Sequence, residues 1–222
     1  MGKKYGQCAA LLTQKSYPLA EAVALLTQVS TTTFDGTAEA HIRILADTTQ
    51  ADQIVRTTVS LPHGTGKTVR IAAFVPDDHV DTAKKAGASR AGNKDLIEEV
   101  SGGNIDFDTA IATPGMMKDL GKIAKILGPK GLMPNPKSGT VSNNIAEVIS
   151  ALQKGRIECK MDKQGIIHVP FGKISFGAHK LQENLSTLLT AINEAKPSGI
   201  KGVYIQSIAI TPTMGPSIHL QV

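Results

Sequence analysis

Alternating polar and apolar positions near both ends of the chain predict strands with one solvated face. In TAEAHIRIL (37–45), alanine and isoleucine alternate with glutamate, histidine and arginine. This two-residue period is typical of an antiparallel sheet that is covered on one side. Five further segments are predicted as strands of this kind: VRTTVSL (55–61), RIECKM (156–161), GIIHVPFG (165–172), GVYIQSIAI (202–210) and SIHLQV (217–222).

Two segments among these strands have helical periodicity. SYPLAEAVALLTQVS (16–30) repeats its apolar residues every three or four positions, with Pro18 in the predicted first turn. The longer AHKLQENLSTLLTAINEA (178–195) is also predicted as a helix. Helices combined with strands that have one solvated face indicate an α+β domain.

The middle of the chain has a different rhythm. TVRIAAFV (68–75) is nearly continuously apolar, as in a strand covered on both faces. Helices and one further strand follow: DDHVDTAKKAG (77–87), NKDLIEEVSGG (93–103) capped by Asn93, the strand DTAIATP (108–114), PGMMKDLGKIAKILG (114–128) opened by Pro114, and SNNIAEVISALQKG (142–155). The alternation predicts an α/β, three-layer, Rossmann-like domain.

The order of the two patterns predicts a discontinuous architecture. An α+β domain with an antiparallel sheet and helices is expected from residues 1–66 and 157–222, interrupted by an inserted α/β domain at 67–156. The chain would cross between the domains near 61–67 and 154–161, and these crossings would form the hinge.

PHGTGKTVR (62–70) contains a Gly-Lys-Thr of the kind found in phosphate-binding loops. Such a loop needs a first glycine where this chain has Leu61, and it needs a strand before it and a helix after it. Here the predicted strand follows the glycines instead. The segment is therefore interpreted as a turn at a domain crossing.

Composition indicates a basic globular protein. The 222 residues carry a formal net charge of +5 and include no tryptophan, which favours a polyanionic partner without proving one. Cys8 and Cys159 are far apart, so two reduced thiols are expected. No apolar run approaches the roughly 20 residues of a membrane span, and the start of the chain lacks the long apolar core of a secretory signal. We expect an intracellular protein without a membrane partner.

The most unusual stretch is LGPKGLMPNPKSGT (127–140), a loop rich in proline and glycine that its own backbone should order. Five lysines and the single carboxylate of Asp119 give residues 118–137 a net charge of +4; the lysines are Lys118, Lys122, Lys125, Lys130 and Lys137. The first three share one face of the predicted helix. This face is either a phosphate-facing stripe or an ordinary solvated surface, and the stiff loop beside it favours binding.

TTTFDGT (31–37) and TPTMGPS (211–217) are notable for having almost no charge. They contain hydroxyls, glycines, Phe34 and Met214, and their only charged residue is Asp35. Taken alone, they are best interpreted as ordinary turns. They also contain the groups that read a folded RNA by ribose contacts, stacking and shape.

The sequence contains few arrangements of residues that are typical of enzymes. The six histidines are scattered, with no His-x-x-x-His pair, no Gly-x-Ser-x-Gly and no Gly-x-Gly-x-x-Gly after the first inner strand. Asp106 and Asp108 are interpreted as turn caps. We expect no catalytic residue, no cofactor and no metal site.

ILGPKGLMPNPKSGTV closely resembles the signature of a known family, that of the universal large-subunit ribosomal protein numbered one, which forms the mobile stalk beside the tRNA exit site. VSLPHGTGK, DKQGIIHVPFGKISF and TPTMGPS are similar to the same family in the same order, so the resemblance runs essentially end to end. It implies a two-domain protein of bacterial or organellar type whose terminal domain binds the stalk rRNA.

The resemblance also implies which residues contact RNA. The residues carried over in the terminal domain are Phe34, Thr37, Ser207, Thr213, Met214, Gly215 and Ser217. Lys130 and Lys137 of the inserted domain would make weaker contacts. Gly36 stands where an acidic residue is common in the family, and Thr33 stands where a lysine is common. Loss of the carboxylate acceptor at position 36 would cost about 1 kcal/mol of binding free energy. Asp35 is a hypothetical replacement for that acceptor.

The resemblance implies a non-enzymatic protein that is a monomer within the ribosome. Its expected partners are the stalk region of the large-subunit rRNA, the exit-site tRNA, whose release it would assist, and its own operon messenger RNA, as a repressor. The expected location is the cytoplasmic ribosome, with an organellar ribosome as the alternative. Two other functions stay open from the residues: an α/β enzyme that binds a nucleotide or sugar phosphate, and a free repressor.

Overall fold

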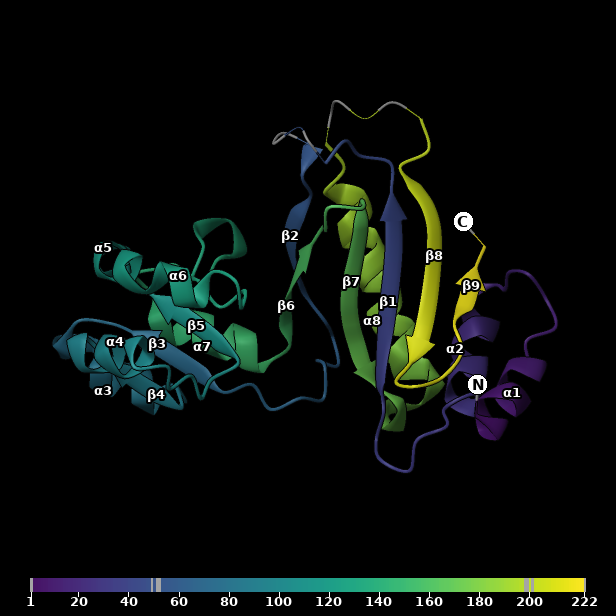
Figure 1. Cartoon of the computed structure of the whole chain (residues 1–222), viewed down its shortest axis with the longest axis horizontal. Coiled ribbons are helices and arrows are strands. Elements are labelled where there is room, and N and C mark those ends of the chain that lie inside the picture. Colours follow the sequence, from purple (N-terminus) through teal and green to yellow (C-terminus); the bar gives the residue numbers. More distant parts are fainter. Residues whose placement is uncertain (1, 49, 51–52, 198–199, 201, 222) are drawn as a thin grey trace. The chain divides into compact units, whose positions relative to one another are not determined.

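The computed structural model describes residues 2–48, 50, 53–197, 200 and 202–221. The chain divides into two compact units: unit 1 comprises residues 1–66 and 157–222, and unit 2 comprises residues 67–156. The elements of unit 1 are α1 (Lys3–Ala10), α2 (Leu19–Gln28), β1 (Thr37–Ile44), β2 (Arg56–Ser60), β6 (Arg156–Lys160), β7 (Ile166–Lys173), α8 (Gly177–Glu194), β8 (Ile205–Pro212) and β9 (Ile218–Leu220), with β6 beginning at the last residue of unit 2 (Figure 1).

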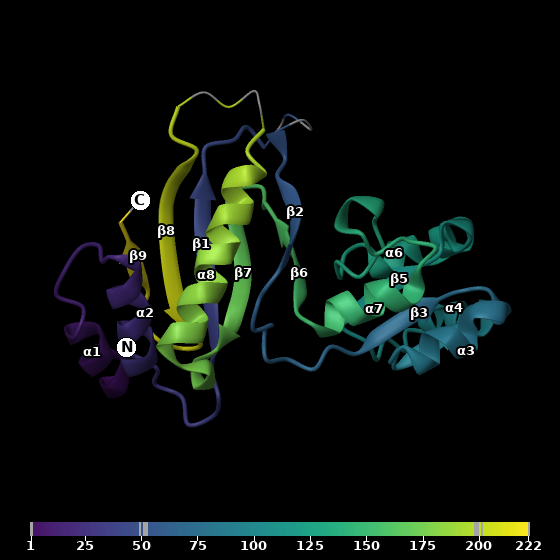
Figure 2. The ribbon, with the colours of Figure 1, turned by 180° about the vertical axis from the view of Figure 1, so that it is seen from behind.

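Unit 1 is built on a four-stranded antiparallel sheet in the order β7-β1-β8-β9. The alternation predicted for residues 37–45 is confirmed, since Ala38, Ala40 and Ile42 of β1 have no exposed surface. Helices α2 and α8 pack on this buried side, and α8 lies in front of the sheet in the reverse view (Figure 2). Among the described residues, no helix covers the other face, which we call the open face (Figures 1 and 2).

Strands β2 and β6 depart from the simplest expectation for unit 1. Val59 of β2 and Cys159 of β6 are buried, but the two strands pair with each other in a separate two-stranded sheet and do not join the four-stranded one. The period of two specifies which face of a strand is buried, but it does not specify the partner strand. The N-terminal helix α1 was not predicted; it is eight residues long, and none of its residues is fully buried.

Unit 2 has a three-stranded parallel sheet in the order β4-β3-β5, formed by β3 (Ile71–Phe74), β4 (Arg90–Gly92) and β5 (Thr109–Ala112). All four residues of β3 are buried, as its continuous apolar pattern predicts. One apolar cluster joins Phe74 to helix α4 (Lys94–Ser101). A second cluster, around Ile71, contains residues of α3 (Asp77–Lys85) and α7 (Ile145–Gln153), so helices cover both faces.

Two predictions for unit 2 need correction. The single helix expected over 114–128 is a succession of short pieces: η2 (Pro114–Met116), α5 (Met117–Leu120), η3 (Gly121–Ile123) and α6 (Ala124–Leu127). Gly121 lies in its middle, and glycine lowers helix propensity by about 1 kcal/mol relative to alanine. Asn93 occupies the N-cap position of α4, but in the described structure its side chain makes no capping hydrogen bond. Strand β4 was not expected, because three residues are too few to show a period.

The Gly-Lys-Thr segment is a turn, as interpreted from the sequence. Gly64 and Gly66 have φ values of 64° and 71°, and the next regular element is β3. The fully buried Asn184 of α8 holds the turn, because its side chain accepts from the His63 backbone N–H at 3.1 Å and donates to the Gly64 carbonyl at 3.0 Å. The segment therefore has a structural role.

Candidate nucleic-acid interface

Antiparallel pairing brings the two nearly uncharged segments to the same end of the sheet. The register places Ala38, at the start of β1, opposite Pro212, at the end of β8. The loop before β1 and the loop after β8 are therefore neighbours, although about 180 residues separate them in the sequence. We call residues 30–36 and 213–217 the neutral loop pair.

Hydrogen bonds tie the two loops together directly. The backbone N–H of Thr213 donates to the Thr37 carbonyl at 3.0 Å, and the Thr37 N–H donates to the Thr213 hydroxyl at 2.9 Å. On the other side of Met214, the Thr31 hydroxyl donates to its carbonyl at 3.3 Å. Thr37 and Thr213 thus use their polar groups partly to position the loops.

Phe34 and Met214 project from the neutral loop pair into solvent, with 61% and 76% of their surface exposed. Met214 has a φ of 63°, and it is the one non-glycine residue in the described chain with a positive φ. This backbone conformation costs roughly 1–2 kcal/mol for an L-residue other than glycine. An exposed apolar side chain held in an unfavourable conformation is a candidate contact residue, because such strain concentrates at functional sites.

Close packing behind Met214 fixes the shape of the turn. A Cβ atom added at Gly215 would lie 2.5 Å from Cγ of Pro212 and 3.0 Å from the Val29 carbonyl oxygen. The Gly215 N–H also donates to the Pro212 carbonyl at 3.0 Å. Gly215 is therefore required by the turn, whatever contact it makes with a ligand. Ser217 is exposed and follows directly before β9.

Asp35 has a structural role in the loop before β1. Its carboxylate accepts hydrogen bonds from the backbone N–H and the hydroxyl of Ser175, at 3.1 and 2.8 Å. Each oxygen thus accepts one hydrogen bond that holds the loop. A carboxylate has about four acceptor positions and Asp35 is exposed, so its replacement of the acidic residue absent at Gly36 stays a prediction. Gly36 is itself buried, and a Cβ there would lie 3.3 Å from the Thr32 hydroxyl. Thr33 is exposed.

Ser207 is not brought together with the loops. It lies on β8 opposite Arg43, six residues before Thr213, which at about 3.3 Å per residue is about 20 Å away. It is exposed on the open face, the same face to which Thr211 belongs. The seven residues assigned to unit 1 from the family resemblance therefore mark one end of the open face and a second point further along it.

Sequence analysis missed a row of three histidines across the open face. The register places His41 of β1 beside His168 of β7 and beside Ala209 of β8, and Ala209 beside His219 of β9. The Nδ1 atoms of His41 and His168 are 2.8 Å apart. The alternating pattern could have put each of them on a solvated face, but their meeting depends on strand register. We call these three residues the histidine row.

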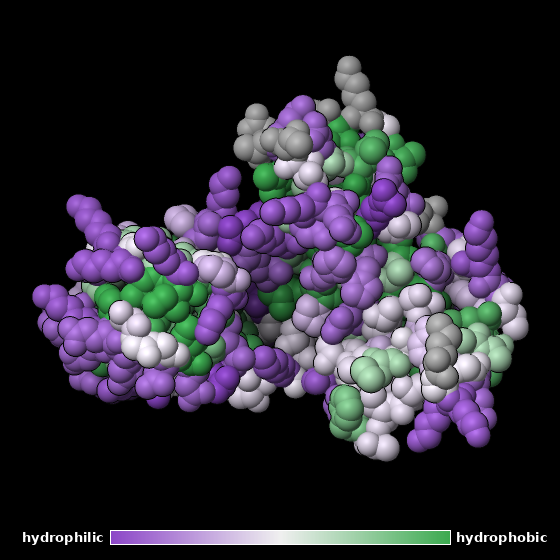
Figure 3. Space-filling model, viewed as in Figure 1, coloured by the Kyte–Doolittle hydropathy of each residue, from purple (hydrophilic) through white to green (hydrophobic). Residues whose placement is uncertain are grey.

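The histidine pair lies within a longer hydrogen-bonded chain. Nε2 of His41 is 3.1 Å from the Thr211 hydroxyl, and Nε2 of His168 is 3.4 Å from Oδ2 of Asp162. Partial burial lowers the pKa of His41, the neighbouring His168 lowers it further, and the Glu39 carboxylate raises it. Hydrophilic side chains cover the middle of this face (Figure 3).

Unit 2 presents a different surface, made by the lysine-rich segment 118–137. All five of its lysines are exposed, and Lys122 pairs with Asp119 at 3.0 Å, which reduces the free charge. The expected shared helix face is now formed by short pieces, so Lys118, Lys122 and Lys125 do not lie on one continuous helix.

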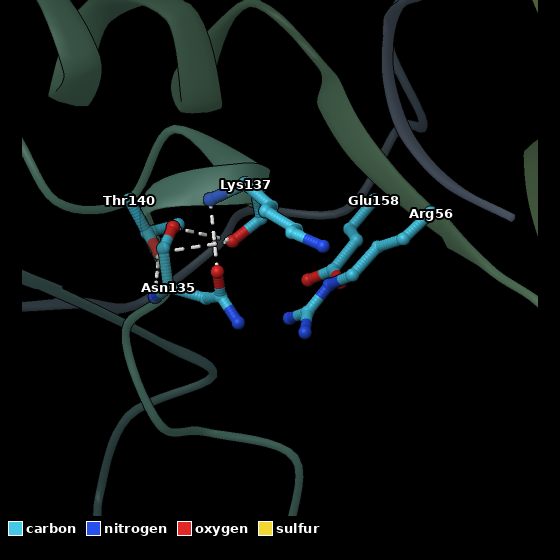
Figure 4. Close-up of polar contacts among 6 residues, drawn as sticks. Arg56, Asn135, Lys137, Thr140 and Glu158 are labelled. Carbon is cyan, nitrogen blue, oxygen red and sulfur yellow. Dashed lines mark hydrogen bonds and ion pairs between the residues drawn. The ribbon is translucent and has the colours of Figure 1, made fainter. Parts of the chain in front are cut away.

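The loop that contains Lys137 is ordered by its own side chains, as its composition predicts. The Asn135 side chain accepts from the Lys137 backbone N–H at 2.8 Å, and the Asn135 N–H donates to the Thr140 hydroxyl at 2.8 Å (Figure 4). Ser138 is buried and donates to the Asn135 carbonyl at 3.0 Å. Gly139 has a φ of 64°. The loop is a rigid support from which Lys137 is exposed.

Two kinds of feature are absent from the described residues. No helix in that part of the chain has the length and apolar character needed to cross a membrane. No group of three or more histidine, cysteine, aspartate or glutamate side chains in the described ranges is arranged to hold a metal ion.

Comparison with known proteins identifies relatives over nearly the whole length of the chain. The model of the Ribosomal protein L1p/L10e family matches residues 26–216. A large ribosomal subunit protein uL1 from Chloroflexus aggregans is 51% identical over 221 residues, which cover 98% of this chain and 93% of that protein. The uL1 of Prochlorococcus marinus is 45% identical, covering 100% and 94%. The protein named uL1c of Trieres chinensis is 50% identical, covering 91% and 88%.

Proposed function

Because the chain belongs to the Ribosomal protein L1p/L10e family, we propose that it is a structural protein of the large ribosomal subunit whose unit 1 binds the stalk rRNA through the neutral loop pair. Its relatives are ribosomal proteins, and the chain is not an enzyme. Family membership therefore excludes the alternative of a nucleotide- or sugar-phosphate-binding enzyme.

The observation that supports this site best is the geometry of Met214. Its side chain is 76% exposed, its φ is positive, and the Thr31 hydroxyl and the closely packed Gly215 hold it in place. An apolar side chain presented so rigidly fits the stacking and shape recognition by which proteins read folded RNA. Phe34, Thr37, Thr213 and Ser217 are proposed to complete the contact, with Ser207 as a further contact along the open face.

Unit 2 is proposed as an inserted domain that contacts the same RNA more weakly. Lys130 and Lys137 are exposed, and the loop around Asn135 fixes the backbone at Lys137. Lysines held in this way bind phosphates without sequence preference. Movement of this domain against the leaving tRNA is proposed to assist release of deacylated tRNA from the exit site.

Repression of its own messenger RNA is proposed as a second role of the same surface. The neutral loop pair recognises shape, so a messenger segment folded like the rRNA site would bind to the same residues. Since the two RNAs would compete, excess rRNA should displace the messenger RNA. Simultaneous binding of both RNAs to one protein molecule would contradict this role.

A charge substitution with a matched control tests the proposed rRNA site. Met214→Asp should abolish binding to the stalk rRNA in a filter-binding assay at fixed salt, because it places a carboxylate against the RNA. Val203→Asp is the control: Val203 is 70% exposed and precedes β8 at the end of the sheet remote from the loops. Equal affinity of the two variants would reject the assigned site.

A further inference from the structure

On the open face of unit 1, no helix or strand of the described residues separates the neutral loop pair from the histidine row. Along β8, Ala209 is four residues from Thr213, or about 13 Å at the usual rise of a strand. A folded RNA segment that is seated on the loops and extends along β8 would carry its backbone over the histidine row.

The histidine row has the chemistry of a proton-dependent phosphate contact. Imidazole changes its charge close to neutral pH, and neighbouring groups shift that transition readily. His168 has 52% of its side-chain surface exposed, so a ligand can reach the pair from solvent.

The hydrogen-bonded chain can be satisfied in two ways that differ by one proton. Without the additional proton, the Thr211 hydroxyl donates to His41, His41 donates through Nδ1 to His168, and His168 donates through Nε2 to Asp162. With the additional proton, His168 donates through both ring nitrogens and His41 accepts at Nδ1. Nε2 of His41 then donates to the Thr211 oxygen.

The second arrangement changes what the surface offers to a ligand. The added positive charge lies on the pair, and the Thr211 hydroxyl hydrogen is released to donate outward. If both histidines carried an added proton, their Nδ1–H groups would point at each other across the 2.8 Å contact. The pair therefore holds one added proton.

Other charged groups around the histidine pair contribute to the local charge that a phosphate would meet. Glu39 and Arg43 lie one row to either side on β1, Asp162 contacts His168, and His219 completes the row on β9. Strand β8 contributes the neutral Thr211, Ala209 and Ser207, and the opposite face is apolar. The exposed Lys160 and Lys163 flank Met161 and Asp162, next to the bridge between Met161 and Ile167. Carboxylates and cations therefore both surround the pair, and an added proton makes this surface more favourable for a phosphate.

We propose that the histidine row is a second RNA contact of unit 1, at which one proton shared by His41 and His168 pairs with a backbone phosphate of the RNA held by the neutral loop pair. The inference rests on the proposed rRNA-binding function. Binding of RNA then takes up a proton, and the affinity falls as the pH rises. The limit for one coupled proton is about tenfold per pH unit.

Proton linkage tests the inference. The affinity for a stalk rRNA fragment is measured at constant salt from pH 5.5 to 8, together with calorimetry in buffers of different ionisation enthalpy, which counts the protons taken up. Between pH 6 and 7.5, the Kd of the wild type should rise about three- to tenfold, with uptake of up to one proton. His168→Gln should lose most of this dependence, because it removes the 2.8 Å contact between the two imidazoles across which the proton is shared.

His179→Gln is the matched control, since His179 is an exposed histidine on α8, which packs on the opposite face. Titration of RNA bases affects all variants equally. A difference in pH dependence between variants therefore comes from the protein. His41→Gln serves as a second variant if His168→Gln melts at a lower temperature. Binding without proton uptake, or with the same pH slope in His168→Gln, overturns the inference alone. Absence of binding at every pH overturns the proposed function as well.

Discussion

The neutral loop pair of unit 1 and residues 127–140 of unit 2, which we call the lysine-rich loop, are both rigid, but they present opposite chemistry. Each contains a residue with a positive φ, Met214 in the first and Gly139 in the second, and each is held by hydroxyl hydrogen bonds. The first exposes Phe34 and Met214, whereas the second exposes Lys130 and Lys137. The proposed function thus places the specific RNA contact on a nearly uncharged surface and leaves the concentrated charge to contacts that position the RNA.

This difference predicts two kinds of failure. Damage to the neutral loop pair should reduce affinity by a factor that is nearly independent of salt, because shape and stacking release few counterions. Damage to the lysine-rich loop should reduce affinity at low salt, and this reduction should become smaller as the salt concentration rises. The following substitutions test the contrast, beginning with the largest expected effect.

Gly215→Val should reduce affinity for the stalk rRNA about 100-fold, equivalent to about 2.7 kcal/mol. The reason is steric: a side chain at this position meets Pro212 and the Val29 carbonyl, so the turn that presents Met214 must open. Filter binding measures the loss, and thermal melting checks the fold. Gly115→Ala in unit 2 is the control, since a Cβ there meets nothing within 4 Å. A folded Gly215→Val protein that keeps wild-type affinity would show that the turn is not the contact.

Met214→Gly separates strain from function. Glycine adopts the positive φ without steric cost, so the free energy of unfolding should stay the same or rise by up to about 1 kcal/mol, whereas affinity should fall about tenfold. Denaturant unfolding and RNA titration measure the two quantities. A parallel loss of stability and affinity would mean that Met214 acts through the fold.

Lys130→Ala combined with Lys137→Ala should weaken binding about fivefold at low salt, since each lysine accounts for at most one phosphate contact. Replacement of both residues by arginine is the control, because it keeps the charge. Affinity that falls equally in the arginine variant would point to loop structure instead of charge.

Asn135→Ala should have the smallest effect on RNA binding. It removes the side-chain acceptor of the Lys137 N–H and should lower the free energy of unfolding of the protein by about 1 kcal/mol, with a less than twofold change in affinity. Calorimetric melting and RNA titration measure both. A large loss of affinity would assign the loop a more specific role than charge placement.

Much of the fold could be predicted because it depends on local patterns. The two-residue period of β1, the apolar run of β3 and the glycine after α3 each lead directly to the observed element. The prediction of one continuous helix over residues 114–128 was wrong. Glycine at position 121 and the irregular piece after Pro114 outweigh the helical pattern of apolar residues there.

The candidate site could be predicted only in part. The loops were singled out by their lack of charge, but their hydrogen bonds join Thr31 and Thr37 to residues far along the chain. The histidine row was missed for the same reason, since His41 and His168 are 127 residues apart and meet only through strand register. Periodicity identifies the exposed face of a strand, while pairing decides which exposed residues become neighbours.

The most direct test of the account is the salt dependence of stalk rRNA affinity for the wild type, Met214→Gly and the Lys130→Ala, Lys137→Ala variant. The neutral loop pair predicts that Met214→Gly shifts the plot of log Kd against log salt in parallel, by about one decade. The lysine variant should instead reduce the slope by about one to two. A reduced slope for Met214→Gly together with a parallel shift for the lysine variant would contradict the assignment of shape recognition to unit 1 and charge to unit 2.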